Sequence, residues 1–233
     1  MQARWLMSFR KLLSKGFGNS LKADALHGTI NYQLSTIMVP HLKTVFRCPW
    51  SLSSELMIKY HDEEWGVPVH NDRKLFEFIV LDTFQAGLSW STILNKRENF
   101  RNAFDNFEPE KVARYSEKRI QKLLNDAGII RNKLKIYGTV NNAKKFIEIQ
   151  KEHGSFDKYI WQFTNFKTIK NSWKDIKNIP ARTIHSDAMS KALYEKGFKF
   201  VGSTICYAFM QAAGMVNDHL IECHRYRSLT LEA

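Results

Sequence analysis

The sequence predicts an all-α protein, and two observations lead to that prediction. Ile136, Val140, Ala143 and Ile147 recur at steps of four, three and four, the spacing of one face of an α-helix. Alternating apolar and polar residues, the pattern of a half-buried strand, are nearly absent from the chain. Residues that begin and end helices punctuate the sequence, and Gly154 closes the helix that carries this apolar face.

The helices before this stretch are predicted from their caps. Asp72 is expected to cap the first, with apolar residues on one face after it. A second helix is expected over 88–104. Pro109 opens a short helix, since proline is tolerated in a first turn, and Ser116 caps the next, which ends by Gly128.

The chain after Gly154 continues the same pattern, with no internal repeat or low-complexity tract. The remaining predicted elements are a short helix over 156–163, irregular chain over 164–184, a helix capped by Ser186 or Asp187 and stopped at Gly197, and a helix over 204–213 ended by Gly214. The fold class is therefore helical throughout.

Charge and composition favour a protein with a polyanionic partner and argue against a membrane-spanning or disulfide-rich protein. The 233 residues include 35 basic and 23 acidic side chains, a net charge of +12. Such an excess fits a polyanionic partner such as nucleic acid, although charge that only serves solubility gives the same sum. No apolar run is long enough to span a bilayer. Three cysteines without disulfide-framework spacing indicate a reducing compartment, so a cytoplasmic location is expected.

The first 46 residues differ in composition from the remainder of the chain. They are basic and carry one acid, Asp24. This composition fits an organelle-targeting segment, a disordered basic arm, or an over-extended start with Met38 as the true one. We expect a disordered extension over 1–46, a single helical domain over 47–227 and a tail over 228–233.

Cysteine and histidine residues form two pairs far apart in the chain. Cys48 precedes His61 by 13 residues, and His219 precedes Cys223 by four. On a helix, a step of four places both side chains on one face, where they can grip one ion. Two thiolates and two imidazoles suit a structural Zn²⁺ site. Two core cysteines with unrelated histidines remain the alternative, and Cys206 or His224 could replace a ligand.

Aromatic residues gather between positions 50 and 90. Five of them are candidates for a binding pocket: Trp50, Tyr60, Trp65, Phe84 and Trp90. Flat aromatic walls suit a nucleobase, because stacking contributes about 1–3 kcal/mol per base. A cationic base would gain further from cation–π contact and from a carboxylate, for which Asp82, Glu63 and Glu64 are the candidates. Packing in a helical core is the alternative for each aromatic residue.

Several long motifs carry a family resemblance. They are Cys48-Pro-Trp50, Tyr60-His-Asp-x-Glu-Trp-Gly-Val-Pro68, Gln85-Ala-Gly-Leu-Ser-Trp90, Lys96-Arg-Glu-Asn99, Asp126-Ala-Gly-Ile-Ile-Arg-Asn-Lys133 and Gly197-Phe-Lys-Phe-Val-Gly-Ser-Thr-Ile-Cys-Tyr207. In this order, over about residues 47–224, they resemble the DNA-3-methyladenine glycosylase I family. The resemblance implies an all-α fold related to the helix-hairpin-helix glycosylases.

The resemblance also assigns residues to roles. It implies one structural zinc ion, bound by Cys48, His61, His219 and Cys223, that joins the N- and C-terminal segments. It implies a 3-methyladenine pocket made by Trp50, Tyr60, Trp65 and Trp90. Gly87 and Leu88 match the element that probes the duplex where the base leaves, and Gly197–Gly202 resembles a hairpin that offers backbone N–H groups to phosphate. Lys196, Lys199 and Gly202 are the DNA-binding residues expected there.

Two positions depart from related patterns. The base-contacting glutamate of the family falls on Asp82, whose side chain is one methylene shorter. The catalytic aspartate of the wider superfamily falls on Asn217, and its catalytic lysine has no counterpart here. That absence fits a monofunctional glycosylase, because no Schiff base can form at that position. Asp82 is still the expected catalytic residue. Its carboxylate would stabilise the charged purine or orient the attacking water.

The expected function is excision of 3-methyladenine from alkylated double-stranded DNA. The nucleotide is flipped out at a cost of about a few kcal/mol, and its weakened N-glycosidic bond is hydrolysed. One alternative is a zinc-stabilised DNA-binding protein that has lost catalysis through Asp82. A zinc hydrolase would need an open coordination position, which four protein ligands do not leave. A monomer that does not bind membranes is expected.

Overall fold

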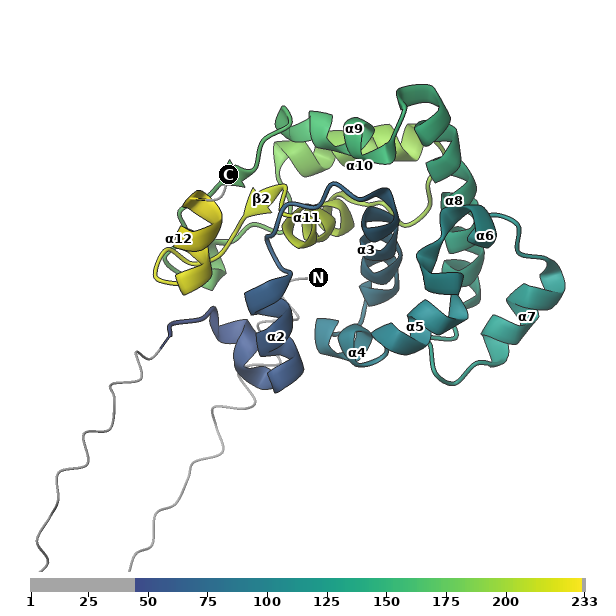
Figure 1. Cartoon of the computed structure of the whole chain (residues 1–233), viewed down its shortest axis with the longest axis horizontal. Coiled ribbons are helices and arrows are strands. Elements are labelled where there is room, and N and C mark those ends of the chain that lie inside the picture. The colour runs from purple at the N-terminus through teal and green to yellow at the C-terminus, as the bar shows by residue number, and fades with distance from the viewer. Residues whose placement is uncertain (1–44, 232–233) are drawn as a thin grey trace, which may run out of the picture. The chain divides into compact units, whose positions relative to one another are not determined.

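The computed structural model describes residues 45–231, so the predictions for residues 1–44 and for 232–233 lie outside the described residues. From Phe46 onward the chain forms one compact unit, built almost wholly of helices (Figure 1). The predicted all-α class is confirmed in this mostly helical form. Within the part of the chain described, no helix combines the length and apolar character needed to cross a membrane.

The elements succeed one another closely along the chain, with 3₁₀ helices labelled η. In order they are η1 (Pro49–Ser53), α2 (Glu55–Glu63), α3 (Asp72–Gln85), α4 (Trp90–Asn95), α5 (Arg97–Ala103), η2 (Asp105–Phe107), α6 (Pro109–Val112), α7 (Glu117–Asn125), α8 (Lys133–His153), α9 (Phe156–Trp161), η3 (Gln162–Thr164), β1 (Ile169–Lys170), η4 (Ile176–Asn178), α10 (Ile184–Glu195), α11 (Ser203–Ala212), β2 (Val216–Asn217) and α12 (His224–Leu231).

Local capping chemistry sets most of these boundaries. Ser116 caps α7 through the Arg119 N–H, as predicted, and Gly154 ends α8 with a positive φ of 85°. The predicted helix over 88–104 is wrong in one respect. It is two helices, α4 and α5, which meet at Lys96.

Two predicted N-caps are also wrong. Asn71, rather than Asp72, caps α3 by accepting from the Lys74 N–H. The Asp72 carboxylate instead accepts from the backbone N–H groups of Phe156 and Asp157 at the start of α9, 84 and 85 residues away. Thr183 caps α10 in a capping box, one turn earlier than expected. A distant partner outcompeted the local cap in the case of Asp72.

The core lies around α3, which is buried over the ten residues from Leu75 to Phe84. Helix α8 packs against α3, α6, α7 and α9, and α11 packs against α3 and α10. Phenylalanine rings pack between these helices. The ring centroid of Phe76 on α3 lies 5.2 Å from that of Phe146 on α8, which lies 4.0 Å from the ring centroid of Phe156 on α9. This framework holds the elements that carry the site.

The C-terminal segment returns to the chain that comes after α2. The N–H groups of Gly66 and Val69 donate to the carbonyls of Gln211 and Ala213, at 3.0 and 3.1 Å. Gly214, with φ of 69°, comes so close that a Cβ there would lie 2.3 Å from the Val67 carbonyl carbon. The stretch 164–184, predicted to be irregular, contains the short strand β1, which pairs in parallel with the two-residue strand β2.

Candidate functional site

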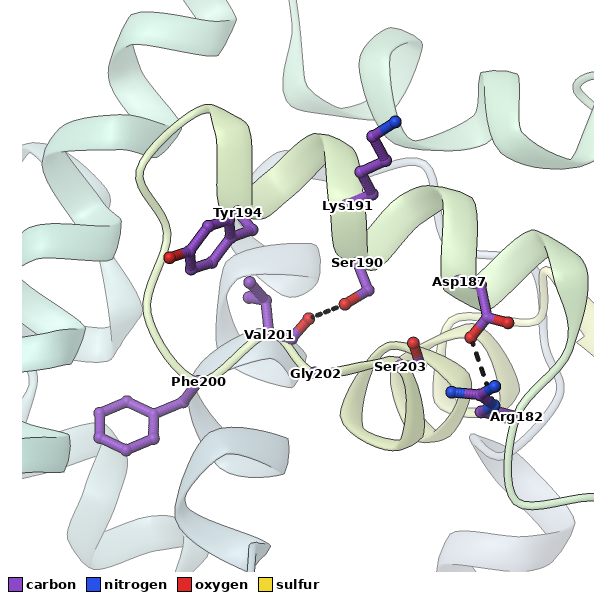
Figure 2. A pocket seen from close by; sticks show the side chains of 9 residues that line it. All are labelled: Arg182, Asp187, Ser190, Lys191, Tyr194, Phe200, Val201, Gly202 and Ser203. Atoms are coloured by element: carbon purple, nitrogen blue, oxygen red, sulfur yellow. Dashed lines mark hydrogen bonds and ion pairs between the residues drawn. The ribbon is translucent and has the colours of Figure 1, made fainter.

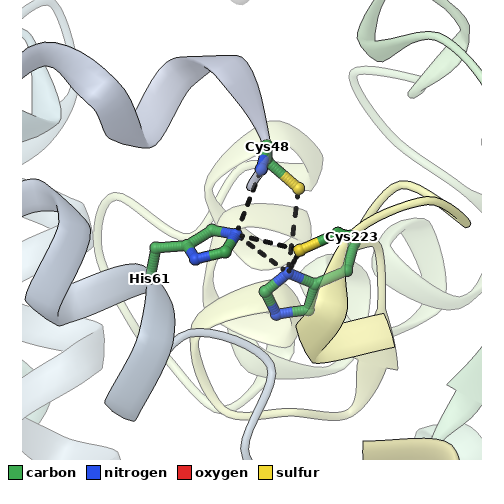
Figure 3. Close-up of side chains that lie close together, drawn as sticks. Cys48, His61 and Cys223 are labelled. Atoms are coloured by element: carbon green, nitrogen blue, oxygen red, sulfur yellow. Dashed lines mark hydrogen bonds between the residues drawn. The ribbon is translucent and has the colours of Figure 1, made fainter. Parts of the chain in front are cut away.

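Four buried side chains from the two ends of the described chain meet beside α2. Cys48 precedes η1, His61 lies on α2, and His219 and Cys223 lie in the loop after β2 (Figure 3). Their ligand atoms all lie within 4.8 Å of one another. The last two lie in a turn rather than on a helix, so the condition under which a step of four places them on one helix face is not met; the Cys223 N–H closes this turn on the Leu220 carbonyl.

The distances within this cluster fit a tetrahedral ion. Bonds of about 2.3 Å to sulfur and about 2.0–2.1 Å to nitrogen place two ligand nitrogens about 3.3 Å apart, and a sulfur and a nitrogen about 3.6 Å apart. His61 Nε2 lies 3.2 Å from His219 Nδ1. Cys223 Sγ lies 3.4 Å and 3.6 Å from these atoms, and Cys48 Sγ lies 3.7 Å from His219 Nδ1. The donor set and its spacing therefore fit a zinc ion.

Hydrogen bonds around the cluster orient both imidazoles. His61 Nδ1 lies 2.7 Å from Asp62 Oδ1, and Arg47 holds that carboxylate from the other side. His219 Nε2 lies 3.0 Å from the Trp65 carbonyl. Each ring thus has one nitrogen next to an oxygen acceptor outside the cluster, and its other nitrogen is directed at the cluster.

Burial and mutual interaction shift the pKa values of the two thiols in opposite directions. A hydrogen bond from Cys48 lowers the pKa of Cys223, and the two imidazoles lower it further. The same hydrogen bond, with burial, raises the pKa of Cys48, although the Leu220 N–H donates to its sulfur at 3.4 Å. Cysteine binds a metal ion as the thiolate, so interactions that lower the pKa of Cys223 favour its ligand form.

Asp218 braces the loop that carries His219. Its carboxylate accepts four hydrogen bonds of 2.6–2.7 Å, from Asn171, Trp173, Tyr207 and Gln211. Two of the four donors come from α11 and two from the segment around β1. The loop is thereby tied to two separate parts of the fold.

Asn217, which precedes Asp218 in this loop, is completely buried. Its Oδ1 accepts from the His219 N–H and its Nδ2 donates to the Tyr226 carbonyl. Both ends of the amide are therefore committed to shaping the loop that carries His219.

The four predicted pocket aromatics form one buried group against this cluster. Trp50 meets the ring of Trp65 edge-on at 5.0 Å, and Tyr60 lies 5.1 Å from Trp90. Trp65 also lies 4.6 Å from the His219 ring. The Cys/His cluster and the aromatic group are therefore in direct contact through Trp65 and His219. The fifth aromatic, Phe84, lies elsewhere, in the core with Phe100 and Phe104.

Two buried polar atoms, one in this group and one whose charge acts on it, lack a hydrogen-bond partner among the described residues. They are Trp90 Nε1 and Asp82 Oδ2. Burial raises the pKa of Asp82 well above its ordinary value, since no cation of the described chain faces it. The Asp82 charge in turn acts on Tyr60 and on Cys206, which places it between α2 and α11. Buried polar groups are rarely left unpaired without a functional reason.

The other two candidate carboxylates do not join Asp82. Arg97 grips Glu64 with two parallel hydrogen bonds of 2.8 Å and also donates to Glu77. This half-buried network, which includes Lys74, lowers the pKa of Glu64 to about 2. Glu63 is exposed and pairs at 4.0 Å with Lys59. Asp82 is thus the carboxylate that the fold leaves available to a base.

The turn between α3 and α4 presents Gly87 and Leu88 at the surface. Gly87 has a φ of 88°, and a Cβ added there would meet nothing within 4 Å. Leu88 is 37% exposed, a large fraction for a leucine. The Gln85 side chain donates to the Leu88 carbonyl, and Ser89 caps α4 at the Thr92 N–H. Backbone and apolar side chain are both open to a partner.

The segment Gly197–Gly202 joins α10 to α11 beside an open hollow of about 520 Å³ (Figure 2). Arg182, Lys191 and the first residues of α11 line this hollow. Lys199 is exposed, whereas Lys196 forms a 2.5 Å ion pair with Glu152. Of the two predicted basic residues, one is therefore free to meet phosphate and the other would first exchange its partner.

Comparison with known proteins identifies the family. A family model described as methyladenine glycosylase matches residues 50–226. The chain belongs to this family. DNA-3-methyladenine glycosylase 1 of Escherichia coli strain K12 is 47% identical over 180 residues, which is 77% of this chain and 96% of that protein. The resemblance predicted from the sequence motifs is confirmed.

Solved structures agree with the family assignment. A crystal structure of 3-methyladenine DNA glycosylase I is 45% identical and has a TM-score of 0.75, covering 77% of this chain and 98% of that one. A variant of 3-methyladenine DNA glycosylase I in complex with 3-methyladenine is 32% identical with a TM-score of 0.74, covering 76% and 96%. Family and fold rest on independent comparisons.

The fold brings together the residues that their types and motifs had grouped, and it excludes two others. Cys206 donates to the Val201 carbonyl and His224 contacts Phe46 and Asp62, so neither enters the ligand cluster. Sequence reasoning did not find the supporting residues, above all Asp218. An aspartate inside Asn217–His219 was a weak signal, because its four donors come from distant segments.

Proposed function

We propose that this protein is a monofunctional DNA glycosylase that releases 3-methyladenine from alkylated double-stranded DNA. The single observation that carries the proposal is the buried Asp82 Oδ2, which lacks a partner among the described residues and whose charge acts on Tyr60, one of the four buried aromatic rings. A relative 47% identical is named DNA-3-methyladenine glycosylase 1, and a related structure contains 3-methyladenine. The proposed cleavage is hydrolysis of an N-glycosyl bond.

The pocket suits a flat, cationic leaving base. Methylation at N3 places a positive charge on adenine, and ring faces attract such a cation. Burial alone holds Asp82 toward its neutral form, so the arriving charge would favour its ionised form. Asp82 would then pair with the base or orient the attacking water. Unmodified adenine offers neither the charge nor the weakened bond.

DNA would be held at two places. Gly87 and Leu88 would enter the duplex where the base leaves it, because an apolar wedge replaces the lost stacking. The unit α10, Gly197–Gly202 and α11 would act as the helix-hairpin-helix, with Gly202 opening α11 toward a phosphate. Lys199 would add charge there, and Lys196 would do so after releasing Glu152.

We further propose that Cys48, His61, His219 and Cys223 hold one structural Zn²⁺. The four donors close a tetrahedral shell, and such an ion supplies folding energy and no chemistry. Its role would be to join the segment before α2 to the loop after β2, inside a single domain over 47–227. A zinc hydrolase remains disfavoured, since hydrolysis at zinc needs an open position.

Base release from methylated duplex DNA, resolved by chromatography, tests the proposal. The purified full-length protein is expected to free 3-methyladenine, and Asp82→Ala is expected to free it at least tenfold more slowly. Glu63→Ala, an exposed carboxylate one helix away, is the matched control. Release of 3-methylguanine is scored in the same chromatogram.

Each outcome of this experiment has a distinct meaning. If Asp82→Ala keeps full activity, the aromatic rings suffice and the role of Asp82 is refuted. If the folded, zinc-loaded wild type binds alkylated duplex but releases no base, the catalytically impaired DNA-binding alternative replaces the glycosylase proposal. If it neither binds nor releases, both are wrong.

A further inference from the structure

Lys135, near the start of α8, is a buried lysine whose hydrogen-bond acceptors among the described residues are backbone carbonyls. It is 7% exposed, and Nζ donates to the carbonyls of Phe84 at 2.9 Å and Ala86 at 2.7 Å. No carboxylate in the described part of the chain forms an ion pair with it. Burial lowers its pKa. The Lys135 ammonium group is therefore held by backbone carbonyls rather than by a carboxylate.

The acceptors belong to the carboxyl end of α3, where helices leave carbonyls unsatisfied and carry partial negative charge. They immediately precede Gly87 and Leu88, the exposed part of the turn. Two further hydrogen bonds join Gln85 and Leu88 within the turn, and the bonds of Ser89 go only to the adjoining helix α4. Lys135 is thus the described side chain that ties this turn to the rest of the fold.

The same helix holds the hairpin Gly197–Gly202, more than 50 residues further along, by different contacts. Asn142 accepts from the Lys199 N–H at 2.7 Å and donates to the Lys199 carbonyl at 2.9 Å. Asn141 donates to the Gly197 carbonyl at 2.8 Å. Gly138 leaves room for Phe200, since a Cβ there would lie 2.8 Å from that ring.

Three of these residues share one face of α8. Lys135, Gly138 and Asn142 stand at i, i+3 and i+7, the spacing of neighbours along a helix surface. Helix α8 runs without a break from Lys133 to His153, so the distance between its contacts is set by its rigid rise. The turn and the hairpin are both attached to this one face.

We propose that this face of α8 sets the spacing between the two DNA-contacting elements, with Lys135 as the positioning residue for the turn and Asn142 for the hairpin. The inference rests on the proposed function, which assigns DNA contact to both elements. Two elements held at a fixed separation engage the duplex together, because the ordering is made before the DNA arrives. Lys135 itself touches neither base nor phosphate.

A double-mutant cycle on the full-length, zinc-loaded protein tests the role of Lys135. Binding is measured by fluorescence anisotropy with a labelled duplex carrying a stable abasic-site analogue, which needs no catalysis. Lys135→Met is expected to weaken binding at least tenfold. In a Leu88→Ala background, Lys135→Met is expected to weaken duplex binding less than threefold. The reason is that the turn has already lost the Leu88 side chain that would enter the duplex. Lys151→Met, an exposed lysine near the far end of α8, is the matched control.

Binding of free 3-methyladenine, monitored by tryptophan fluorescence, separates positioning from general damage. Lys135→Met is expected to change that affinity less than twofold. The proposal would be overturned if Lys135→Met weakened binding of the free base as much as binding of the duplex. It would also be overturned if the loss of duplex affinity in the double variant equalled the product of the losses in the Lys135 and Leu88 single variants. If Lys135→Met melts below the assay temperature, Lys135→Gln, which keeps one donor group, replaces it in the cycle.

Asn142, which holds the hairpin rather than the turn, provides a comparison with Lys135. Asn142→Leu is expected to weaken duplex binding, and its effect is expected to multiply with that of Leu88→Ala, because it acts on the other element. A wild type that binds the duplex and obeys these patterns but releases no base would refute the proposed function alone. A wild type that releases base while the cycle shows no coupling would refute the α8 proposal alone.

Discussion

Replacing Asp218 by alanine is expected to destabilise the protein severely, although the residue is placed in no chemical step. The change removes a carboxylate that accepts four hydrogen bonds of 2.6–2.7 Å. Asn171 and Trp173 are half-buried and regain water, whereas the buried donors of Tyr207 and Gln211 do not. Each donor left unsatisfied costs about 1–3 kcal/mol, so about 4 kcal/mol in all is expected.

Urea denaturation of the zinc-loaded protein measures this loss. With a slope of about 2 kcal/mol per molar urea, a loss of about 4 kcal/mol moves the midpoint down by about 2 M. Asp218→Asn is expected to lose about half as much, because its amide oxygen serves one pair of donors and its NH₂ opposes the other. Tyr207→Phe, which removes one donor and keeps the carboxylate, is expected to cost about 1–2 kcal/mol.

The control for this series is Glu63→Ala, an exposed carboxylate with a 4.0 Å partner, whose loss costs less than about 1 kcal/mol. A midpoint for Asp218→Ala within about 0.5 M of the wild type would refute the reasoning. It would mean that water reaches all four donors, and that the loop before Cys223 holds its own shape.

Three further changes test the metal, the buried carboxyl and the close backbone contact. A strong chelator should lower the melting temperature, and added Zn²⁺ should restore it, since a ligand bound only to the folded state stabilises that state; an unchanged melting curve would contradict a structural ion. Asp82→Asn should stabilise the protein increasingly as pH rises above the ordinary aspartate pKa of 3.8, with thermal melts across pH as the measurement. The reason is that the raised pKa of folded Asp82 gives stability at low pH that is lost as pH rises through that pKa, and asparagine removes this dependence; parallel curves would show that Asp82 is not desolvated. Gly214→Ala should yield little folded protein by circular dichroism, because its Cβ would lie 2.3 Å from the Val67 backbone; a stable variant would mean that the two segments separate easily.

Local signals predicted the helices well where a helix depends on its own neighbours. The stripe from Ile136 to Ile147 became α8, and Ser116 caps α7 as its sequence suggested. The failure at Asp72 has an identifiable cause. Asp72 was expected to cap its own helix, but its carboxylate reaches the start of α9 and Asn71 caps instead. A sequence pattern cannot weigh a local hydrogen bond against a distant one.

The site shows the same division. Residue types alone indicated zinc ligands and a stacking pocket, and family motifs assigned them to positions. Whether Cys48 and His61 could meet His219 depended on segments 171 and 158 residues apart, which no spacing rule bridges. The distances among them come from the backbone pairing of Gly66 with Gln211 and of Val69 with Ala213.

The sequence by itself determined the helical class, the family and the residue types available for a metal and a base, because these depend on local periodicity and on motif identity. Only the tertiary structure decided which carboxylate stays unpaired. Arg97 neutralises Glu64 and Glu63 faces solvent, whereas Asp82 is buried without a cation from the described chain. Pairing of charges is a property of neighbours in space, and a chain acquires those neighbours only by folding.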